Sequence, residues 1–296
     1  MKMMKVEGEQ KRYALLLAAR DSDYVKKVYG GYLNVFIETL GEEGEIWDLF
    51  RVVDGDFPAM DDLHSYEGFV ISGSPYDAYG NEPWILQLCL LLQALFSMQK
   101  KVLGICFGHQ VLCRALGGKV GKAYSGWDIG VRKVEIVKDL CFQFLGDDDN
   151  NLEETSPSLS IIEVHQDEVW EVPIGAEVLA FSDKTCVEMF RIGEHILGIQ
   201  GHPEYTKDIL NNLIDRLLSN GSIEIKDTNC PTPKMVLEGQ SQQLIHSCYD
   251  SYKYLFHACK QIGFAEDVRA KILAAEPDRK CWEKICKTFL KGKVEI

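Results

Sequence analysis

The chain has 296 residues, 46% of them hydrophobic, enough for a substantial core in one large domain or in a domain with an appendage. Its formal net charge of -13, from 45 acidic residues against 32 Lys and Arg, argues against nucleic acid or an anionic membrane surface as a partner. The polar start lacks a secretory leader, and no apolar run approaches the roughly 20 residues of a membrane span, so we expect a cytosolic protein.

The ten cysteines are scattered through predicted strands and helices, which favours reduced thiols over a disulfide framework. No Cys-x-x-Cys pair occurs, and the histidines do not lie at metal-ligand spacing from the cysteines. We therefore expect chemistry that uses neither a metal nor another cofactor.

After a flexible segment at 1–12, the first part of the chain alternates strands with helices. Strands are predicted at 13–18, 45–53, 68–72 and 101–105, and helices at 24–39 and 83–99. This alternation is typical of a parallel sheet.

The strand at 68–72 runs into a glycine turn, Ser72-Gly73-Ser74-Pro75. Free backbone N–H groups in such a turn can stabilise the oxyanion of a tetrahedral acyl intermediate. The N–H groups of Gly73 and Phe107 are the two candidate donors. Taken alone, the segment is more simply a plain turn at the end of a strand.

The strand at 101–105 leads directly into Cys106, and helical spacing follows as far as 117–118. Gly104 and Gly108 flank Cys106 at minus two and plus two, as in the Gly-x-Ser-x-Gly elbow that lifts a nucleophile clear of its backbone. The start of a helix also favours the thiolate form of the attacking group. The pattern predicts Cys106 to be a nucleophile rather than a buried core cysteine.

After this helix the pattern becomes rich in strands, which indicates an antiparallel extension of the sheet. The predicted strands are 129–137, 160–165, 176–182, 185–192 and 195–200. The polar run at 147–160 is predicted to be an exposed loop without a chemical role.

The last of these strands leads into Gly201-His202-Pro203-Glu204. In an extended segment, side chains two positions apart point the same way, so Glu204 can hold one ring nitrogen of His202 while the other faces the thiol. His202 is therefore the predicted general base and Glu204 its orienting carboxylate. Without Cys106 upstream, a surface turn would explain this tetrapeptide equally well.

Together, these segments resemble the class I glutamine amidotransferase family. GICFGHQ at 104–110 matches the family's nucleophile motif, GHPEY at 201–205 its His-x-Glu motif and SGSP at 72–75 its oxyanion strand. EVHQDEVWEVP and DRKCWEKICKTFLKGKV are similar to the plant γ-glutamyl peptidase subgroup in particular. The resemblance implies a three-layer, flavodoxin-like α/β fold with a mostly parallel central sheet and an antiparallel extension, in an amidotransferase domain at 13–220.

Residues 221–296 are expected to form a helical C-terminal extension. Its segment 227–262 has a turn-rich start and an aromatic helical pattern with no counterpart in the family, so we interpret it as an insertion before the final helix. Its aromatic stripe is more typical of a packing face than of a ligand site.

Members of the family recognise a γ-glutamyl group. The resemblance places Gln110 and the chain around His165, Gln166 and Asp167 near the α-amino and α-carboxylate groups of that substrate. Gln110 lies one helical turn beyond Cys106, on the same face. A strand-end histidine satisfied by the backbone describes His165 equally well.

The resemblance implies a cysteine peptidase that hydrolyses the γ-glutamyl bond of glutathione or of its S-conjugates through a thioester, in plant sulfur and glucosinolate metabolism. The alternative is a glutaminase subunit that supplies ammonia to a synthetase, although the sequence identifies no partner protein. A third interpretation, a noncatalytic scaffold, is disfavoured because Cys106, His202 and Glu204 are all present.

Overall fold

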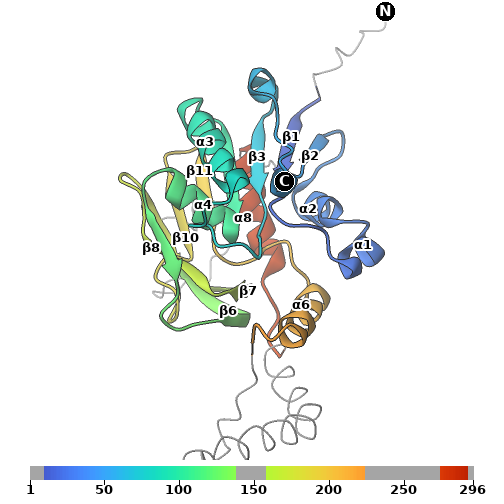
Figure 1. Ribbon diagram of the computed structural model, residues 1–296, viewed down its shortest axis with the longest axis vertical. Helices are drawn as coiled ribbons and strands as arrows, with labels where there is room; N and C mark the ends of the chain where they lie inside the picture. The colour runs from blue at the N-terminus through green and yellow to red at the C-terminus, as the bar shows by residue number, and fades with distance from the viewer. Residues whose placement is uncertain (1–9, 138–157, 224–273, 293–296) are drawn as a thin grey trace, which may run out of the picture. The chain divides into compact units, whose positions relative to one another are not determined.

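The computed structural model describes residues 10–137, 158–223 and 274–292 (Figure 1). Most of the N-terminal segment 1–12, most of the predicted loop at 147–160 and the whole predicted insertion at 227–262 lie outside these residues. The chain divides into one compact unit of residues 1–210 and 276–296 and a second of residues 211–275. The predicted bounds of the domain at 13–220 and of the extension at 221–296 stay predictions.

The first unit is built on a nine-stranded sheet in the order β2-β1-β3-β4-β11-β10-β9-β6-β7. Neighbours from β2 to β11 run parallel, and neighbours from β11 to β7 run antiparallel. Its strands are β1 (Arg12–Leu16), β2 (Ile46–Phe50), β3 (Gly68–Ile71), β4 (Lys101–Ile105), β6 (Asp128–Ile136), β7 (Ser158–His165), β9 (Glu177–Phe181), β10 (Met189–Ile192) and β11 (Ile196–Ile199). The predicted sheet with its antiparallel extension is confirmed.

Helices cover both faces of this sheet (Figure 1). On one face, α3 (Pro83–Ser97) and α4 (Phe107–Ala115) pack against the side chains of Phe69 and Ile71. On the other, α2 (Tyr32–Leu40) and α8 (Arg279–Lys291) pack against Val70 and Leu103. Successive residues of a strand face opposite sides, so both faces of the central strands are buried and the fold has three layers.

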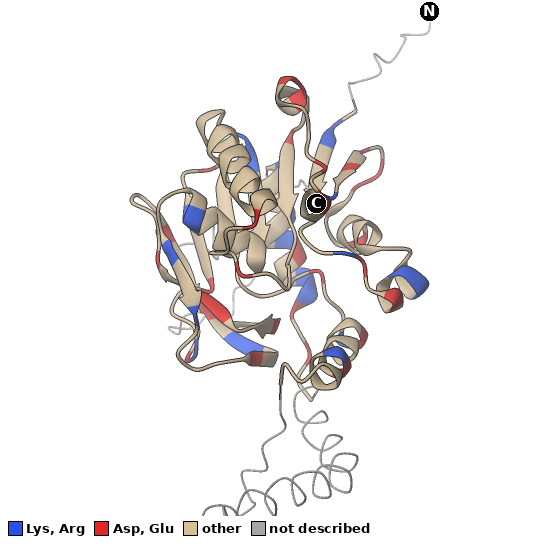
Figure 2. Cartoon of the chain, in the orientation of Figure 1, with Lys and Arg blue, Asp and Glu red and all other residues tan. Residues whose placement is uncertain are grey.

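Much of the centre of the sheet is apolar, and its central strand β4 carries a charge only at its first residue, Lys101. β3 and β11 contain only Gly, Phe, Val, Ile and Leu, and α3 has no charged residue (Figure 2). Strands that are covered on both faces require such apolar runs. Among the described helices, none is both long and apolar enough to cross a membrane.

The predicted helix at 24–39 is two helices, α1 (Asp23–Tyr29) and α2. The break falls at Gly30 and Gly31, whose φ angles are 77° and 123°. These left-handed conformations suit glycine and end α1, where the Gly30 N–H donates to the carbonyl of Lys26. The sequence analysis predicted one helix because apolar residues keep a helical spacing on both sides of the two glycines.

Other differences lie at short strands. The predicted strand at 45–53 is β2 followed by a 3-10 turn, η1 (Val52–Asp54), and the one at 185–192 shortens to β10. Before β10, the Ser182 hydroxyl accepts from the N–H of Thr185 and forms a turn. The sequence analysis missed β5 (Lys119–Lys122) and β8 (Asp167–Glu171), which pair as a separate two-stranded sheet.

Two glycines permit a close approach of β3, β4 and α4. A methyl group on Gly104 would lie 2.5 Å from the backbone of Gly108, and one on Gly108 would lie 2.4 Å from the carbonyl oxygen of Ile71. Both contacts are with backbone, which cannot move aside as a flexible side chain can. The start of α4 therefore sits directly on the sheet only because side chains are missing at these two positions.

We expect Gly104→Ala to lower the free energy of unfolding by about 2 kcal/mol or more, because the added methyl group overpacks a buried contact. Urea denaturation followed by circular dichroism measures the change. Gly44→Ala is the control, since Gly44 has a φ of 86° but open space around it, and should cost only about 1 kcal/mol of backbone strain. Equal losses in the two variants would contradict the close-approach argument.

Candidate active site

Cys106 lies at the joint between β4 and α4 in a strained conformation. Its φ is 53° and its ψ is -105°, one of two positive φ values outside glycine in the described residues. Its N–H donates to the carbonyl of Ile199 at 2.9 Å, and its own carbonyl accepts from the N–H of Gln110 at 3.1 Å. Such strain persists only where the surroundings enforce it, and it is common at active sites. The backbone thus has the form of a nucleophile elbow.

His202 and Glu204 follow β11 and form a buried pair. Nδ1 of His202 lies 2.9 Å from Oε1 of Glu204, and the His202 N–H donates to the carbonyl of Ile162 at 2.8 Å. Because a carboxylate only accepts, Nδ1 carries the proton in this contact. The Nε2 atom is the ring nitrogen that remains for the thiol of Cys106.

Gly73 brings the three predicted segments together. A methyl group on Gly73 would lie 2.8 Å from Cε1 of His202 and 3.6 Å from Cβ of Cys106. The turn after β3 therefore lies against both the nucleophile and the base. Phe107 is the first residue of α4, where a helix provides no acceptor for the backbone N–H. Both predicted oxyanion donors thus belong to the backbone next to Cys106, and their role in an oxyanion hole stays a prediction.

The charge balance around His202 favours its protonated form. Burial alone would lower its pKa, but the carboxylate of Glu204 and then Cys106 outweigh burial and raise the pKa to about 10. An imidazolium beside the thiol would stabilise the thiolate and hold a proton ready for a leaving group.

Tyr205 is a site residue to which the sequence analysis gave no role. Its ring is parallel to that of His202, with centroids 4.0 Å apart and an interplanar angle of 3°. A cation over an aromatic face is stabilised by the ring quadrupole. Tyr205 thus packs flat against the imidazole of His202, a contact that favours the charged form of the ring. The only signal in the sequence was its place directly after Glu204.

Gln110 lies behind the nucleophile, and its amide N–H groups are bound within the chain. Nε2 donates to the carbonyl of Asp167 at 2.8 Å and to Oε1 of Gln200 at 3.0 Å. The side chain therefore ties α4 to the start of β8. Its contact with a substrate stays a prediction.

His165 is bound by the backbone, as one of the two interpretations of the sequence proposed. Its Nδ1 lies 2.9 Å from the carbonyl oxygen of Asp167, and burial lowers its pKa to about 4. The ring is neutral at pH 7, with the proton on Nδ1. A substrate contact of His165 also stays a prediction.

Gln166 and Asp167 share a cation at the rim of the site. Nζ of Lys122 lies 3.0 Å from Oδ1 of Asp167 and 3.3 Å from Oε1 of Gln166. The Tyr79 hydroxyl donates to the same carboxylate oxygen of Asp167 at 3.3 Å. The predicted contact of Gln166 and Asp167 with the α-amino and α-carboxylate groups of a substrate stays a prediction.

Comparison with known proteins agrees with this arrangement. The family described as "Glutamine amidotransferase class-I" matches residues 28–219, a range that includes Cys106, His202 and Glu204. The chain belongs to this family. Solved amidotransferases from Methylobacillus flagellatus and Thermotoga maritima align with 96% of the chain, and with 94% and 100% of their own, at TM-scores of 0.60 and 0.58. Their identity of 18% shows the fold alone, which confirms the predicted three-layer architecture.

The chain also resembles two plant proteins over nearly its whole length. It is 48% identical over 290 residues to γ-glutamyl peptidase 5 of Arabidopsis thaliana, and the alignment covers 97% of this chain and 98% of the relative. It is 46% identical over 291 residues to γ-glutamyl peptidase 3 of the same plant, and this alignment covers 98% of this chain and 100% of the relative. The predicted likeness to the plant γ-glutamyl peptidase subgroup is confirmed.

The raised pKa of His202 predicts the pH above which activity falls. We expect kcat/KM to fall near pH 10, where His202 loses the proton that the leaving group requires. Glu204→Gln should move this limb to lower pH, because it removes the charge that contributes most to raising the pKa of His202. Glutamate release measured from pH 6 to 11 checks both statements. Glu177→Gln, an exposed change at the start of β9, is the control, and an unmoved limb in Glu204→Gln would contradict the assignment.

Replacement of Tyr205 tests the stacking contact. Tyr205→Leu should lower kcat by about 10-fold and shift the alkaline limb to lower pH, since a cation over an aromatic ring is worth about 1 to 2 kcal/mol when buried. Tyr205→Phe keeps the ring and should stay within about 2-fold of the wild type. If the two variants have the same kcat and the same pH profile, stacking does not act on His202.

Proposed function

We propose that this chain is a cysteine-dependent hydrolase of γ-glutamyl bonds and that it acts on glutathione or glutathione S-conjugates. The observation that carries the proposal is the 48% identity over 290 residues to a relative named γ-glutamyl peptidase 5. The buried pair of His202 and Glu204 beside the strained Cys106 also supports the proposal, because a cysteine nucleophile needs such a base.

In the first half of the proposed reaction, the thiolate of Cys106 attacks the γ-carbonyl carbon of the substrate. The carbonyl oxygen becomes an oxyanion that accepts from the N–H groups of Gly73 and Phe107. As the tetrahedral intermediate collapses, the C–N bond breaks and His202 transfers its Nε2 proton to the departing amine. The products of this half are a γ-glutamyl thioester on Cys106 and a free amine, which is Cys-Gly or its S-conjugate.

In the second half, neutral His202 removes a proton from a water molecule, and the resulting hydroxide attacks the thioester. The same N–H groups hold the second oxyanion, the C–S bond breaks, and glutamate leaves. Glu204 accepts a hydrogen bond from Nδ1–H of His202 throughout the reaction and stabilises the imidazolium each time it forms. We further propose a cytosolic role in sulfur metabolism such as glucosinolate formation.

A glutaminase subunit that supplies ammonia to a partner synthetase is the second candidate. The match to the class-I glutamine amidotransferase model favours it, because that family is named for glutamine. The first step would be the same, with ammonia in place of the dipeptide as the leaving group. The two candidates therefore differ in the substrate and in the fate of the amine, not in the cysteine chemistry.

A substrate panel separates the two candidates. Purified protein is incubated separately with glutamine, glutathione and a glutathione S-conjugate, and released glutamate is measured. We expect kcat/KM for glutathione or the conjugate to exceed that for glutamine by at least about 10-fold, or about 1.4 kcal/mol of transition-state binding. Preference for glutamine would overturn the peptidase proposal and favour the glutaminase.

Three variants test the nucleophile, the base and its carboxylate with the preferred substrate. Cys106→Ala should abolish glutamate release, and His202→Ala should be nearly as damaging, whereas Glu204→Gln should leave more activity because it only orients the base. Each variant should keep the circular dichroism spectrum of the wild type. Turnover in Cys106→Ala would rule out the covalent mechanism.

A further inference from the structure

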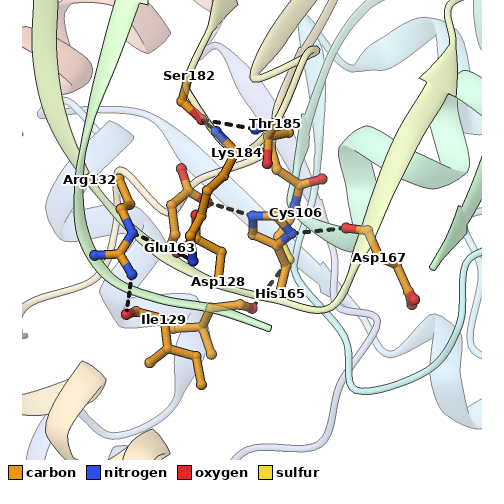
Figure 3. Close-up of polar contacts among 12 residues, drawn as sticks. Cys106, Asp128, Ile129, Arg132, Glu163, His165, Asp167, Ser182, Lys184 and Thr185 are labelled. Atoms are coloured by element: carbon orange, nitrogen blue, oxygen red, sulfur yellow. Dashed lines mark hydrogen bonds and ion pairs between the residues drawn. The ribbon is translucent and has the colours of Figure 1, made fainter. Parts of the chain in front are cut away.

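A group of buried ionisable side chains lies next to the catalytic residues and has no part in the reaction described above. It contains Asp128 at the start of β6, Glu163 and His165 on β7, and Glu188 directly before β10. The four side chains are at most 4% exposed. Figure 3 shows the ring of His165 between Glu163 and Asp167, close to Cys106. Among the described residues, no three His, Cys, Asp or Glu side chains are placed to hold a metal ion.

Asp128 is the member of this group that forms ion pairs with basic side chains. Its Oδ1 lies 2.6 Å from Nε of Arg132 and 3.3 Å from Nζ of Lys184. By contrast, the carboxyl oxygens of Glu163 and Glu188 are all buried, none forms an ion pair with Arg132 or Lys184, and the two carboxyl groups lie close enough to interact with each other. An ionised carboxylate in such surroundings is costly, and the usual outcome is that it takes up a proton.

The contacts of Glu163 reach both catalytic segments. Its Oε2 lies 3.5 Å from Nε2 of His165. A methyl group on Gly201 would lie 2.5 Å from its Oε1, so the carboxyl group sits against the backbone that leads into His202. The next residue on β7, Val164, presents its carbonyl oxygen 3.9 Å from Sγ of Cys106.

His165 determines which atom must donate in this contact. Its Nδ1–H donates a hydrogen bond to the carbonyl of Asp167, so Nε2 of the neutral ring offers only a lone pair. An ionised Glu163 would place a second acceptor opposite that lone pair. A protonated Glu163 places a donor there instead. At 3.5 Å the contact is longer than a usual hydrogen bond, so the proton acts mainly by removing the repulsion between two facing acceptors.

We infer that Glu163 is a neutral carboxylic acid in the folded protein, and that its proton, held toward Nε2 of His165, positions the end of β7 against Cys106 and His202. Glu163 does not touch the substrate, so it is a positioning residue. The direction of its pKa agrees, since burial raises it well above the usual value, and Glu188, Asp128 and Cys106 raise it further. The pKa of Glu188, raised to about 7 mainly by burial, adds a second carboxyl group that resists ionisation.

Substitution at Glu163 tests the donor. Glu163→Gln keeps the size of the side chain and supplies an N–H donor, so kcat should stay within about 3-fold of the wild type. Glu163→Leu removes the donor, and kcat should fall by about 10- to 100-fold with KM unchanged, because small displacements of reacting groups cost up to about 100-fold. Equal losses of kcat in the two variants would overturn the inference. This arm rests on the proposed function, since it needs the substrate.

Two further measurements need no substrate, so they remain decisive if the proposed function fails. Infrared spectra at pH 7.5 should show the carbonyl stretch of a protonated carboxylic acid in the wild type, and this band should be lost or reduced in Glu163→Gln. Glu188→Gln is the matched control that separates the two carboxyl groups. A band that is absent from the wild type, or unchanged in Glu163→Gln, overturns the inference.

Thermal stability gives the second of these measurements. A carboxyl group whose pKa is raised by folding loses stabilising free energy as pH rises from its unfolded value of about 4.5 toward its folded value. Glu163→Gln lacks this loss, so its Tm relative to the wild type should increase steadily from pH 5 to pH 8. A constant difference in Tm over this range would overturn the inference, whether or not Glu163→Leu folds.

Discussion

The active site depends on how closely the backbones of β3, β4 and α4 approach one another. Gly104 and Gly108 leave no side chain between these elements, and Cys106 takes a φ of 53° to pass from strand to helix. Any other residue at the two glycine positions would push α4 away from the sheet. The thiol, the N–H of Phe107 and the turn at Gly73 all derive their positions from this contact. The strain at Cys106 is therefore maintained by packing that extends through the core.

Burial and neighbouring charge then determine the protonation of the groups around the thiol. His202 lies beside the charge of Glu204 and holds a proton, whereas His165 is bound by the backbone of Asp167 and stays neutral. Two buried histidines of the same site thus have pKa values of about 10 and about 4. The difference comes from one carboxylate at 2.9 Å from the first ring, against a backbone carbonyl at the same distance from the second.

Local sequence patterns predicted much of the fold and indicated the candidate reactive residues. The alternation of strands and helices, the glycines around Cys106 and the two-residue spacing of His202 and Glu204 are all local signals. The break at Gly30 and Gly31 was missed because apolar periodicity does not resolve a turn of two residues. The strands β5 and β8 were missed because most of their residues are charged or glycine, so they show no apolar run. Glu163, Gln200 and Tyr205 were also missed. Glu163 and Gln200 contact segments far apart in the chain, Gly201 and Gln110 respectively, which no local pattern can indicate. Tyr205 stacks on a residue only three positions away, but the sequence does not show which way its ring points.

The sheet changes direction beside the reacting groups, and this has a consequence for how the site can be assembled. Cys106 follows a parallel strand, while the backbone of His202 is bonded to Ile162 of the antiparallel part. His202 itself follows β11, which is parallel to β4, so its backbone is held by both parts of the sheet. In chain order, β11 comes after the antiparallel strands β6, β7, β9 and β10. The base therefore reaches the thiol only once the chain has passed through the whole antiparallel part and returned to β4. A chain folded only as far as α4 would have the cysteine without its base, and would show no turnover.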